Sequence, residues 1–158
     1  MKKVVFVCTG NTCRSPMAKG LFLKHLALKY PDWCNECEVL AAGLSAVPGE
    51  GASSEAIAVM RDIGVDLSEH RAQLVTEEVL RDADLILTMT GRHRDYLRQA
   101  YGEQKNIFSL YEFLGQERDI QDPFGWGEDV YRECRDEIEE AILLLLEKLK
   151  QESPDTPE

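Results

Sequence analysis

The sequence has no hydrophobic run long enough to cross a bilayer, which takes roughly 20 apolar residues. Ala141–Leu146 is only a short apolar run, and Val4–Val7 is too short for the hydrophobic core of a secretory signal. We therefore expect a cytoplasmic protein that neither spans nor enters a membrane.

Basic residues are also scarce. Lysine and arginine number 18 against 29 aspartates and glutamates, which gives a net charge of -11 at pH 7. A field of this sign repels nucleic acids and anionic membrane surfaces, so neither is expected as a partner. A small anionic substrate remains compatible, because a local site can oppose the global field.

The cysteines are too few and too uneven for a disulfide framework. They number five, an odd count, at positions 8, 13, 34, 37 and 134, and no secretory signal precedes them. The thiols are therefore expected to be reduced. Cys34 and Cys37 have the spacing of half a zinc site, but no matching pair follows, so we expect no metal and no cofactor.

Short apolar segments alternate with helical patterns along the chain. Strands are expected at Lys3–Val7, Glu38–Ala42, Asp84–Thr88 and Asn106–Ser109. Helices are expected at Pro16–Lys29, Glu55–Asp62, just after Thr76, at Arg92–Tyr101, at Leu110–Leu114 and at Asp129–Lys150. Such alternation predicts an α/β sandwich with a parallel sheet. We expect a single domain over residues 1–150 and a disordered tail over residues 151–158.

The segment Cys8–Ser15 lies between the first strand and the first helix and has the spacing C-x5-R-S. Five residues between a thiol and a guanidinium let the chain curl around one tetrahedral anion. The backbone N–H groups of the curl converge, and the following helix directs its positive end at the same point. Gly10 and Asn11 can adopt the left-handed backbone angles that the curl requires. The segment therefore predicts a phosphate-binding loop at the carboxyl end of the sheet.

This loop also suggests a reaction. Its positive field is expected to lower the pKa of Cys8 well below the ordinary thiol value of ~8.5. The resulting thiolate can attack phosphorus while Arg14 binds the phosphoryl oxygens. Asp122, followed by Pro123 and Phe124, can supply a proton to the leaving group. Cys8, Arg14 and Asp122 are therefore the predicted catalytic residues of a phosphatase.

Together these motifs resemble the low-molecular-weight protein tyrosine phosphatase family. The resemblance covers about Lys2–Lys150 and includes C-x5-R-S, Ala-Gly after the second strand, Asp66–Ala72, Ala83–Met89 and Asp-Pro-aromatic, in that order. It implies a three-layer domain whose four-stranded parallel sheet carries helices on both faces, without a metal. It also implies a cysteinyl-phosphate intermediate.

The resemblance implies roles for individual residues. Cys8 is the nucleophile, Arg14 binds the phosphate, and Asp122 acts first as acid and then as base for the attacking water. The residues around the substrate are Thr9, Gly10, Asn11, Thr12, Cys13, Ser15 and Phe124. Asn11, Ser15 and His70 brace the loop by hydrogen bonds. Ala41 stands where the family often has serine, so part of this network is expected to be missing.

Two positions bear on the substrate. Thr12 stands where the tyrosine phosphatases usually carry an aliphatic residue, and Phe124 where they usually carry tyrosine or tryptophan. Thr12 with Asp-Pro-Phe-Gly resembles the protein-arginine phosphatase branch. A hydroxyl can hydrogen-bond a guanidinium nitrogen, and Asp122 can hold the cation before protonating that nitrogen. We therefore predict phosphoarginine in proteins as the substrate, with phosphotyrosine as the alternative.

Two other functions share parts of this pattern. Arsenate reductases have the same fold but need two further cysteines near the third strand, and Leu80–Gly91 contains none. A non-catalytic phosphate-binding module would keep Arg14 but has no need of both Cys8 and Asp122.

Three further expectations concern residues near the motif. The resemblance suggests that Cys8 and Cys13 form a reversible disulfide that protects the nucleophile from over-oxidation, with simple packing of Cys13 as the alternative. His93 is expected to be solvated. A solvated basic face is expected on the same helix, made by Arg92, Arg94 and Arg98.

Overall fold

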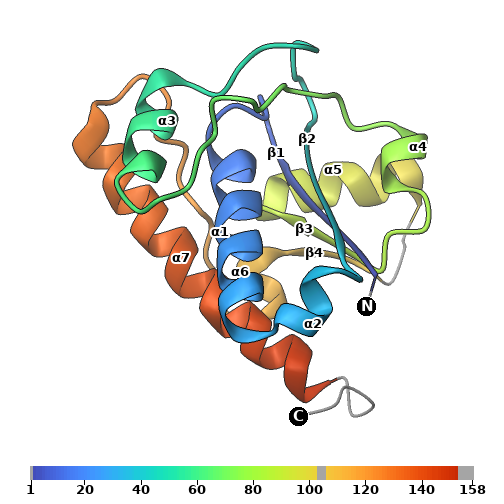
Figure 1. The fold of residues 1–158 in the computed structure, drawn as a ribbon. Helices are drawn as coiled ribbons and strands as arrows, with labels where there is room; N and C mark the ends of the chain where they lie inside the picture. Colours follow the sequence, from blue (N-terminus) through green and yellow to red (C-terminus); the bar gives the residue numbers. More distant parts are fainter. Residues whose placement is uncertain (1, 103–105, 153–158) are drawn as a thin grey trace.

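A four-stranded parallel sheet forms the centre of the computed structural model, which describes residues 2–102 and 106–152 (Figure 1). The strands are β1 (Lys3–Cys8), β2 (Glu38–Gly43), β3 (Leu85–Thr88) and β4 (Ile107–Ser109), in the order β2-β1-β3-β4. Every neighbouring pair is parallel. The predicted α/β architecture is confirmed.

The side chains of β1 alternate between two apolar layers. Val4 and Phe6 pack in the layer that contains α1 (Arg14–Lys29), α3 (Ser54–Arg61) and α7 (Glu128–Gln151). Val5 and Val7 pack in the layer that contains α4 (Glu77–Leu80) and α5 (Gly91–Tyr101). A strand buried on both faces is apolar at every position, which explains the continuous run seen in the sequence.

Two helices differ from the prediction. α1 begins at Arg14, so the end of the C-x5-R-S motif forms its first turn, and Pro16 is tolerated there because first-turn N–H groups have no partner within the helix. The short helix α2 (Pro31–Cys34) was not predicted, although its proline occupies a preferred first position. The remaining short helix is α6 (Leu110–Phe113).

The C-terminal helix extends slightly beyond the predicted domain boundary, to Gln151. Residues 153–158 of the predicted disordered tail lie outside the described residues. Within the described part of the chain, no helix combines the length and the apolar character that crossing a membrane requires.

The predicted basic face of α5 is wrong for two of its three arginines. Arg94 and Arg98 lie 3.4 Å and 3.5 Å from the carboxylate of Glu112 in α6. That carboxylate also accepts the backbone N–H of Ser109 in a capping box. Only Arg92 is exposed as expected, because the fold brings the carboxylate of Glu112 against the other two.

Candidate active site

The loop between β1 and α1 curls around the sulfur of Cys8, which is only 2% exposed. The backbone N–H of Asn11 donates to this sulfur at 3.3 Å, and the Ser15 hydroxyl lies 2.9 Å from it. Asn11 has a left-handed φ of 57°, as predicted, but the φ angle of Gly10 is not positive. One left-handed residue is therefore enough to turn the loop, and the prediction for Gly10 is wrong.

The end of β2 makes room for this loop at Gly43. A Cβ atom at Gly43 would lie 2.6 Å from the carbonyl oxygen of Thr9 and 2.9 Å from the backbone nitrogen of Asn11. Real Cβ atoms do not approach backbone atoms so closely, so only glycine fits. The N–H of Leu44 donates to the carbonyl of Cys8 at 3.0 Å, which ties the loop to the chain just after β2.

Asn11 is fully buried and uses its polar groups to hold the loop. Its Nδ2 donates to the Ser15 hydroxyl at 2.8 Å, and its Oδ1 accepts the backbone N–H of Gln73 at 2.9 Å. Its backbone carbonyl accepts Nε2–H of His70 at 2.7 Å. The pKa of His70 is lowered overall, because the effect of burial exceeds the opposite effect of the bond to Asn11. The structure thus brings Asn11, Ser15 and His70 into one network.

Gln73 connects this network to β2, and the sequence carried no signal for it. Its side-chain Nε2 donates to the carbonyl of Ala41 at 3.0 Å, and its backbone carbonyl accepts the N–H of Gly43 at 2.9 Å. The loop is therefore anchored to β2 at the position where the family often has a serine hydroxyl.

The electrostatics of Cys8 differ from the prediction. Burial is the largest influence on its pKa and raises it, whereas the hydrogen bonds of Ser15, the charge of Arg14 and the N–H of Asn11 lower it. The expectation of a pKa well below the ordinary value is therefore wrong in its net direction. The reason is that the sulfur lies at the bottom of the loop, away from solvent.

The guanidinium of Arg14 is buried above the same loop. Its Nη1 donates to the carbonyl of Ile120 at 2.9 Å. Its Nη2 lies 3.5 Å from the hydroxyl of Thr9 and 3.6 Å from a carboxylate oxygen of Asp122. The backbone N–H of Ile120 donates to the carbonyl of Met89, which fixes the loop that carries Asp122.

Asp122 faces Arg14 across the mouth of the site. Its side chain is half exposed, and its Oδ1 accepts the backbone N–H of Phe124 at 3.1 Å, which closes a turn around Pro123. The ring of Phe124 is 69% exposed. A carboxyl group in this position is accessible to solvent and to a leaving group.

These elements enclose a cavity of about 240 Å³, lined by Cys8, Thr9, Gly10, Thr12, Cys13, Arg14, Glu50, Asp122 and Phe124. The cavity therefore unites most of the predicted site residues. Asn11, Ser15 and His70 do not line it and support the loop from behind.

Two residues near the site were missed by the sequence analysis. Glu50 contributes a carboxylate to the cavity from an exposed loop that carries no motif. His93 was predicted to be solvated but is only 7% exposed, and its Nε2 lies 2.8 Å from the hydroxyl of Thr9. The available signal was Thr90, whose capping side chain places His93 in the first turn of α5, at the carboxyl edge of the sheet.

Cys13 lines the cavity together with Cys8. Its sulfur lies 3.2 Å from the hydroxyl of Tyr131 and donates to that of Ser53 at 3.5 Å. All five cysteines are free thiols in this structure. Among the described residues, no group of three or more acidic, histidine or cysteine side chains is arranged to hold a metal ion.

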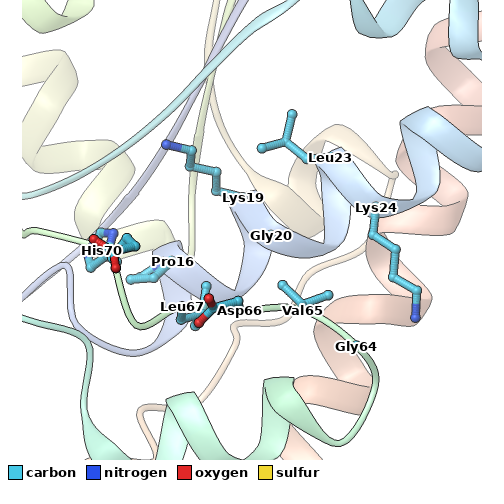
Figure 2. A pocket seen from close by; sticks show the side chains of 11 residues that line it. Pro16, Lys19, Gly20, Leu23, Lys24, Gly64, Val65, Asp66, Leu67 and His70 are labelled. Atoms are coloured by element: carbon cyan, nitrogen blue, oxygen red, sulfur yellow. The ribbon is translucent and has the colours of Figure 1, made fainter.

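A larger cavity, of about 590 Å³, lies between α1 and the segment 64–70 (Figure 2). Its lining includes Lys19, Lys24 and Asp66 but none of the cysteines and neither Arg14 nor Asp122. None of the residues 8–15 of the phosphate loop lines it, although Pro16 follows the loop and His70 bonds the loop at Asn11. The smaller cavity contains both a thiol and a guanidinium, and it is therefore the candidate active site.

The fold and the loop together define a class of α/β protein in which a C-x5-R turn after the first strand surrounds a thiol with anion-binding groups. The sequence model of the family described as "Low molecular weight phosphotyrosine protein phosphatase" matches residues 3–155. The chain belongs to this family and is a cysteine-dependent protein phosphatase.

Its relatives include two kinds of phosphatase. The protein-arginine-phosphatase of Bacillus subtilis is 38% identical over 151 residues, covering 94% of this chain and 97% of the relative. The low molecular weight protein-tyrosine-phosphatase PtpB of Staphylococcus epidermidis is 38% identical over 141 residues, covering 89% and 94%. A solved structure of YwlE arginine phosphatase, a cysteine-to-serine mutant with a phosphorylated active-site serine, matches with a TM-score of 0.86 at 37% identity, covering 94% of this chain and 95% of that one.

Proposed function

We propose that this phosphatase hydrolyses phosphoarginine in proteins through a cysteinyl-phosphate intermediate on Cys8. The observation that carries the proposal is the polarity of the cavity wall. Thr12, Glu50 and Asp122, whose side chains carry one hydroxyl and two carboxyl groups, line the cavity that also contains Cys8 and Arg14. Phosphoarginine ends in a cationic guanidinium with several N–H donors, which these acceptors suit. The similarity to a protein-arginine-phosphatase supports the same substrate.

The first step transfers the phosphoryl group to the enzyme. The loop N–H groups, the positive end of α1 and Arg14 bind the phosphoryl oxygens and stabilise the charge of the transition state. The thiolate of Cys8 attacks phosphorus, so an S–P bond forms while the P–N bond breaks. Asp122 gives its proton to the leaving nitrogen, and arginine departs as its guanidinium.

The second step regenerates the enzyme. Asp122, now a carboxylate, takes a proton from a water molecule, and that water attacks the phosphorus of the intermediate. The S–P bond breaks, inorganic phosphate leaves, and the thiolate of Cys8 is restored. The hydroxyl of Ser15, 2.9 Å from the sulfur, stabilises the thiolate as the leaving group.

Phosphotyrosine is the second candidate substrate. The exposed ring of Phe124 at the cavity mouth can pack against a phenol ring, and one relative is a protein-tyrosine-phosphatase. A phenol ring, however, offers no donor to Thr12 or Glu50. The acceptors of the cavity wall therefore favour the guanidinium.

Phosphorylated proteins are the substrates that this family implies. We place the enzyme in the cytoplasm, where reduced thiols such as that of Cys8 persist. The net charge of -11 supports neither nucleic acid nor an anionic membrane as a partner.

The substrate proposal is tested with two phosphopeptides of the same sequence, one with phosphoarginine and one with phosphotyrosine. We expect kcat/KM to favour phosphoarginine. Thr12→Ile should shift the ratio of the two values toward phosphotyrosine by roughly tenfold, the worth of about one hydrogen bond. Glu50→Gln should lower only the phosphoarginine value, by a few fold, because the carboxylate lies on an exposed loop.

Matched controls separate recognition from general damage. Glu55→Gln removes a nearby acidic charge outside the cavity and should leave the ratio unchanged. Cys8→Ser should abolish turnover yet retain phosphate binding, which distinguishes the enzyme from a binding module. A native preference for phosphotyrosine would refute phosphoarginine specificity. An unchanged ratio in both Thr12→Ile and Glu50→Gln would refute the argument from the cavity wall.

We also propose a protective Cys8–Cys13 disulfide. Both thiols line the same small cavity, so mild oxidation of Cys8 leaves a sulfenic acid that Cys13 can attack, with loss of water. Mass spectrometry after mild peroxide treatment should show a mass loss of two hydrogens and a bridged peptide. A sulfinic acid on Cys8 without a bridge would contradict it.

A further inference from the structure

His93 is a buried histidine with one side-chain partner. It lies in the first turn of α5, where its backbone N–H donates to the hydroxyl of Thr90 at 3.2 Å. Its ring Nε2 lies 2.8 Å from the hydroxyl of Thr9, the residue that follows Cys8. Its Nδ1 has no hydrogen-bond partner among the residues that the structure describes. The polar contact of the ring is therefore directed at the phosphate loop.

The same hydroxyl of Thr9 contacts Arg14. The Nη2 nitrogen of Arg14 lies 3.5 Å from this hydroxyl and 3.6 Å from the carboxylate of Asp122, so it stands between two competing acceptors. A threonine hydroxyl can accept one hydrogen bond and donate another. It can thus accept from Arg14 and donate its own proton to a neutral His93, which makes a continuous polar chain.

The charges around His93 favour the neutral ring. Burial and the cation of Arg14 lower the pKa of His93 to about 4, with a smaller contribution from Arg92, whereas Asp119 and Asp122 raise it. Near neutral pH the ring is therefore uncharged, and Nε2 can accept a proton from Thr9. A protonated ring would instead repel Arg14 and could no longer accept.

The turn that carries His93 also holds the loop of the general acid. The N–H of Gly91 donates to the carboxylate of Asp119 at 2.9 Å. The carbonyl of Met89 accepts the N–H of Ile120, whose own carbonyl accepts Arg14. The segment 89–93 therefore contacts both the phosphate loop, at Thr9, and the loop that leads to Asp122.

We propose that His93 is a positioning residue that acts through Thr9 to hold Nη2 of Arg14 toward the phosphate loop, in competition with the carboxylate of Asp122. The inference rests on the proposed role of Arg14 in binding phosphate. Its consequence is twofold: the guanidinium is oriented toward the phosphoryl oxygens, and Asp122 remains available for proton transfer.

The test uses the full chain, p-nitrophenyl phosphate as substrate and inorganic phosphate as inhibitor. His93→Leu should lower kcat/KM and weaken phosphate inhibition, each by roughly tenfold, the worth of about one hydrogen bond. Thr9→Val should have a similar effect. The double variant should lose little more than either single variant, because both break one chain.

Two conservative variants separate positioning from packing. His93→Gln can place a side-chain amide near the position of Nε2 and should restore most of the activity. His93→Asn is too short and should not. His25→Gln removes a histidine that pairs with Glu139 and does not line the cavity, and should leave both constants unchanged.

Arg14→Lys in the same assays separates this inference from the proposed function. If Arg14→Lys has no effect, the proposed phosphate-binding role itself fails. If Arg14→Lys lowers kcat/KM and weakens phosphate inhibition while a folded His93→Leu variant keeps both constants within twofold of the native values, the His93 inference alone fails. Should His93→Leu not fold, equal activities of His93→Gln and His93→Asn, or a native-like Thr9→Val, would overturn it.

Discussion

At the scale of single residues, the reactivity of Cys8 depends on opposing influences around one sulfur atom. Burial disfavours the thiolate, whereas Ser15, Arg14 and Asn11 favour it. Because Nδ2 of Asn11 donates to the hydroxyl oxygen of Ser15, the hydroxyl proton remains free to point at the sulfur. Asn11 thus leaves the hydroxyl of Ser15 oriented to donate to the sulfur of Cys8, the proposed nucleophile.

Ser15→Ala should therefore raise the pKa of Cys8 further. Since only the thiolate reacts, the pH profile of alkylation by iodoacetamide should move to higher pH. At neutral pH, kcat/KM should fall by roughly tenfold or more, because a hydrogen bond to a charged group contributes ~1.5–3 kcal/mol. Ser54→Ala, whose hydroxyl bonds Glu55 on the surface, is the matched control. An unshifted profile would mean that the hydroxyl does not donate to the thiolate.

At the scale of elements, the site depends on how closely the phosphate loop approaches the end of β2. β1 lies between β2 and β3, so its carboxyl end meets loops from both neighbours. On the β2 side the approach is closest at Gly43, where a Cβ atom would meet the backbone of Thr9 and Asn11. The loop therefore depends on a missing side chain as well as on its own sequence.

Gly43→Ala should force the loop away from β2. Overpacking against backbone atoms is expected to destabilise the fold by ~1–3 kcal/mol and to lower Tm by several degrees. Phosphate binding should weaken as well, because the displaced loop includes Asn11. Gly51→Ala is the control, since its nearest neighbour is a side-chain atom of Arg71 at 3.8 Å. Equal Tm values and phosphate affinities for the two variants would contradict this account.

At the scale of the whole molecule, two histidines couple the site to global stability. His70 and His93 come from different segments and contact the phosphate loop at Asn11 and at Thr9. Burial is the main cause that lowers the pKa of each histidine. Each is therefore held neutral by the fold. The unfolded chain has no such restraint and takes up protons first as the pH falls.

The free energy of unfolding should therefore decrease in acid. The folded pKa of His93, about 4, lies below its usual value of 6.5. The contribution of neutral His93 to the free energy of unfolding is complete above pH 6.5, the usual pKa. This contribution is lost progressively as the pH falls toward the folded pKa of about 4. Urea unfolding at a series of pH values checks this, and His93→Gln should flatten the dependence between these limits. A native curve that is already flat there would contradict the assignment.

Local patterns in the sequence were sufficient for the sheet, the phosphate loop and the Asp122 turn, because each depends on neighbours a few positions apart. The complete burial of Val4–Val7 and the left-handed turn at Asn11 are examples. Tertiary structure alone decided the burial of His93 against Thr9, the pairing of Arg94 with Glu112 and the position of Glu50 on the cavity wall. Tertiary structure also decided the direction of the pKa shift at Cys8, where burial raises the pKa more than the positive field of the loop lowers it. These features depend on desolvation and on contacts between distant segments, and no local spacing encodes either.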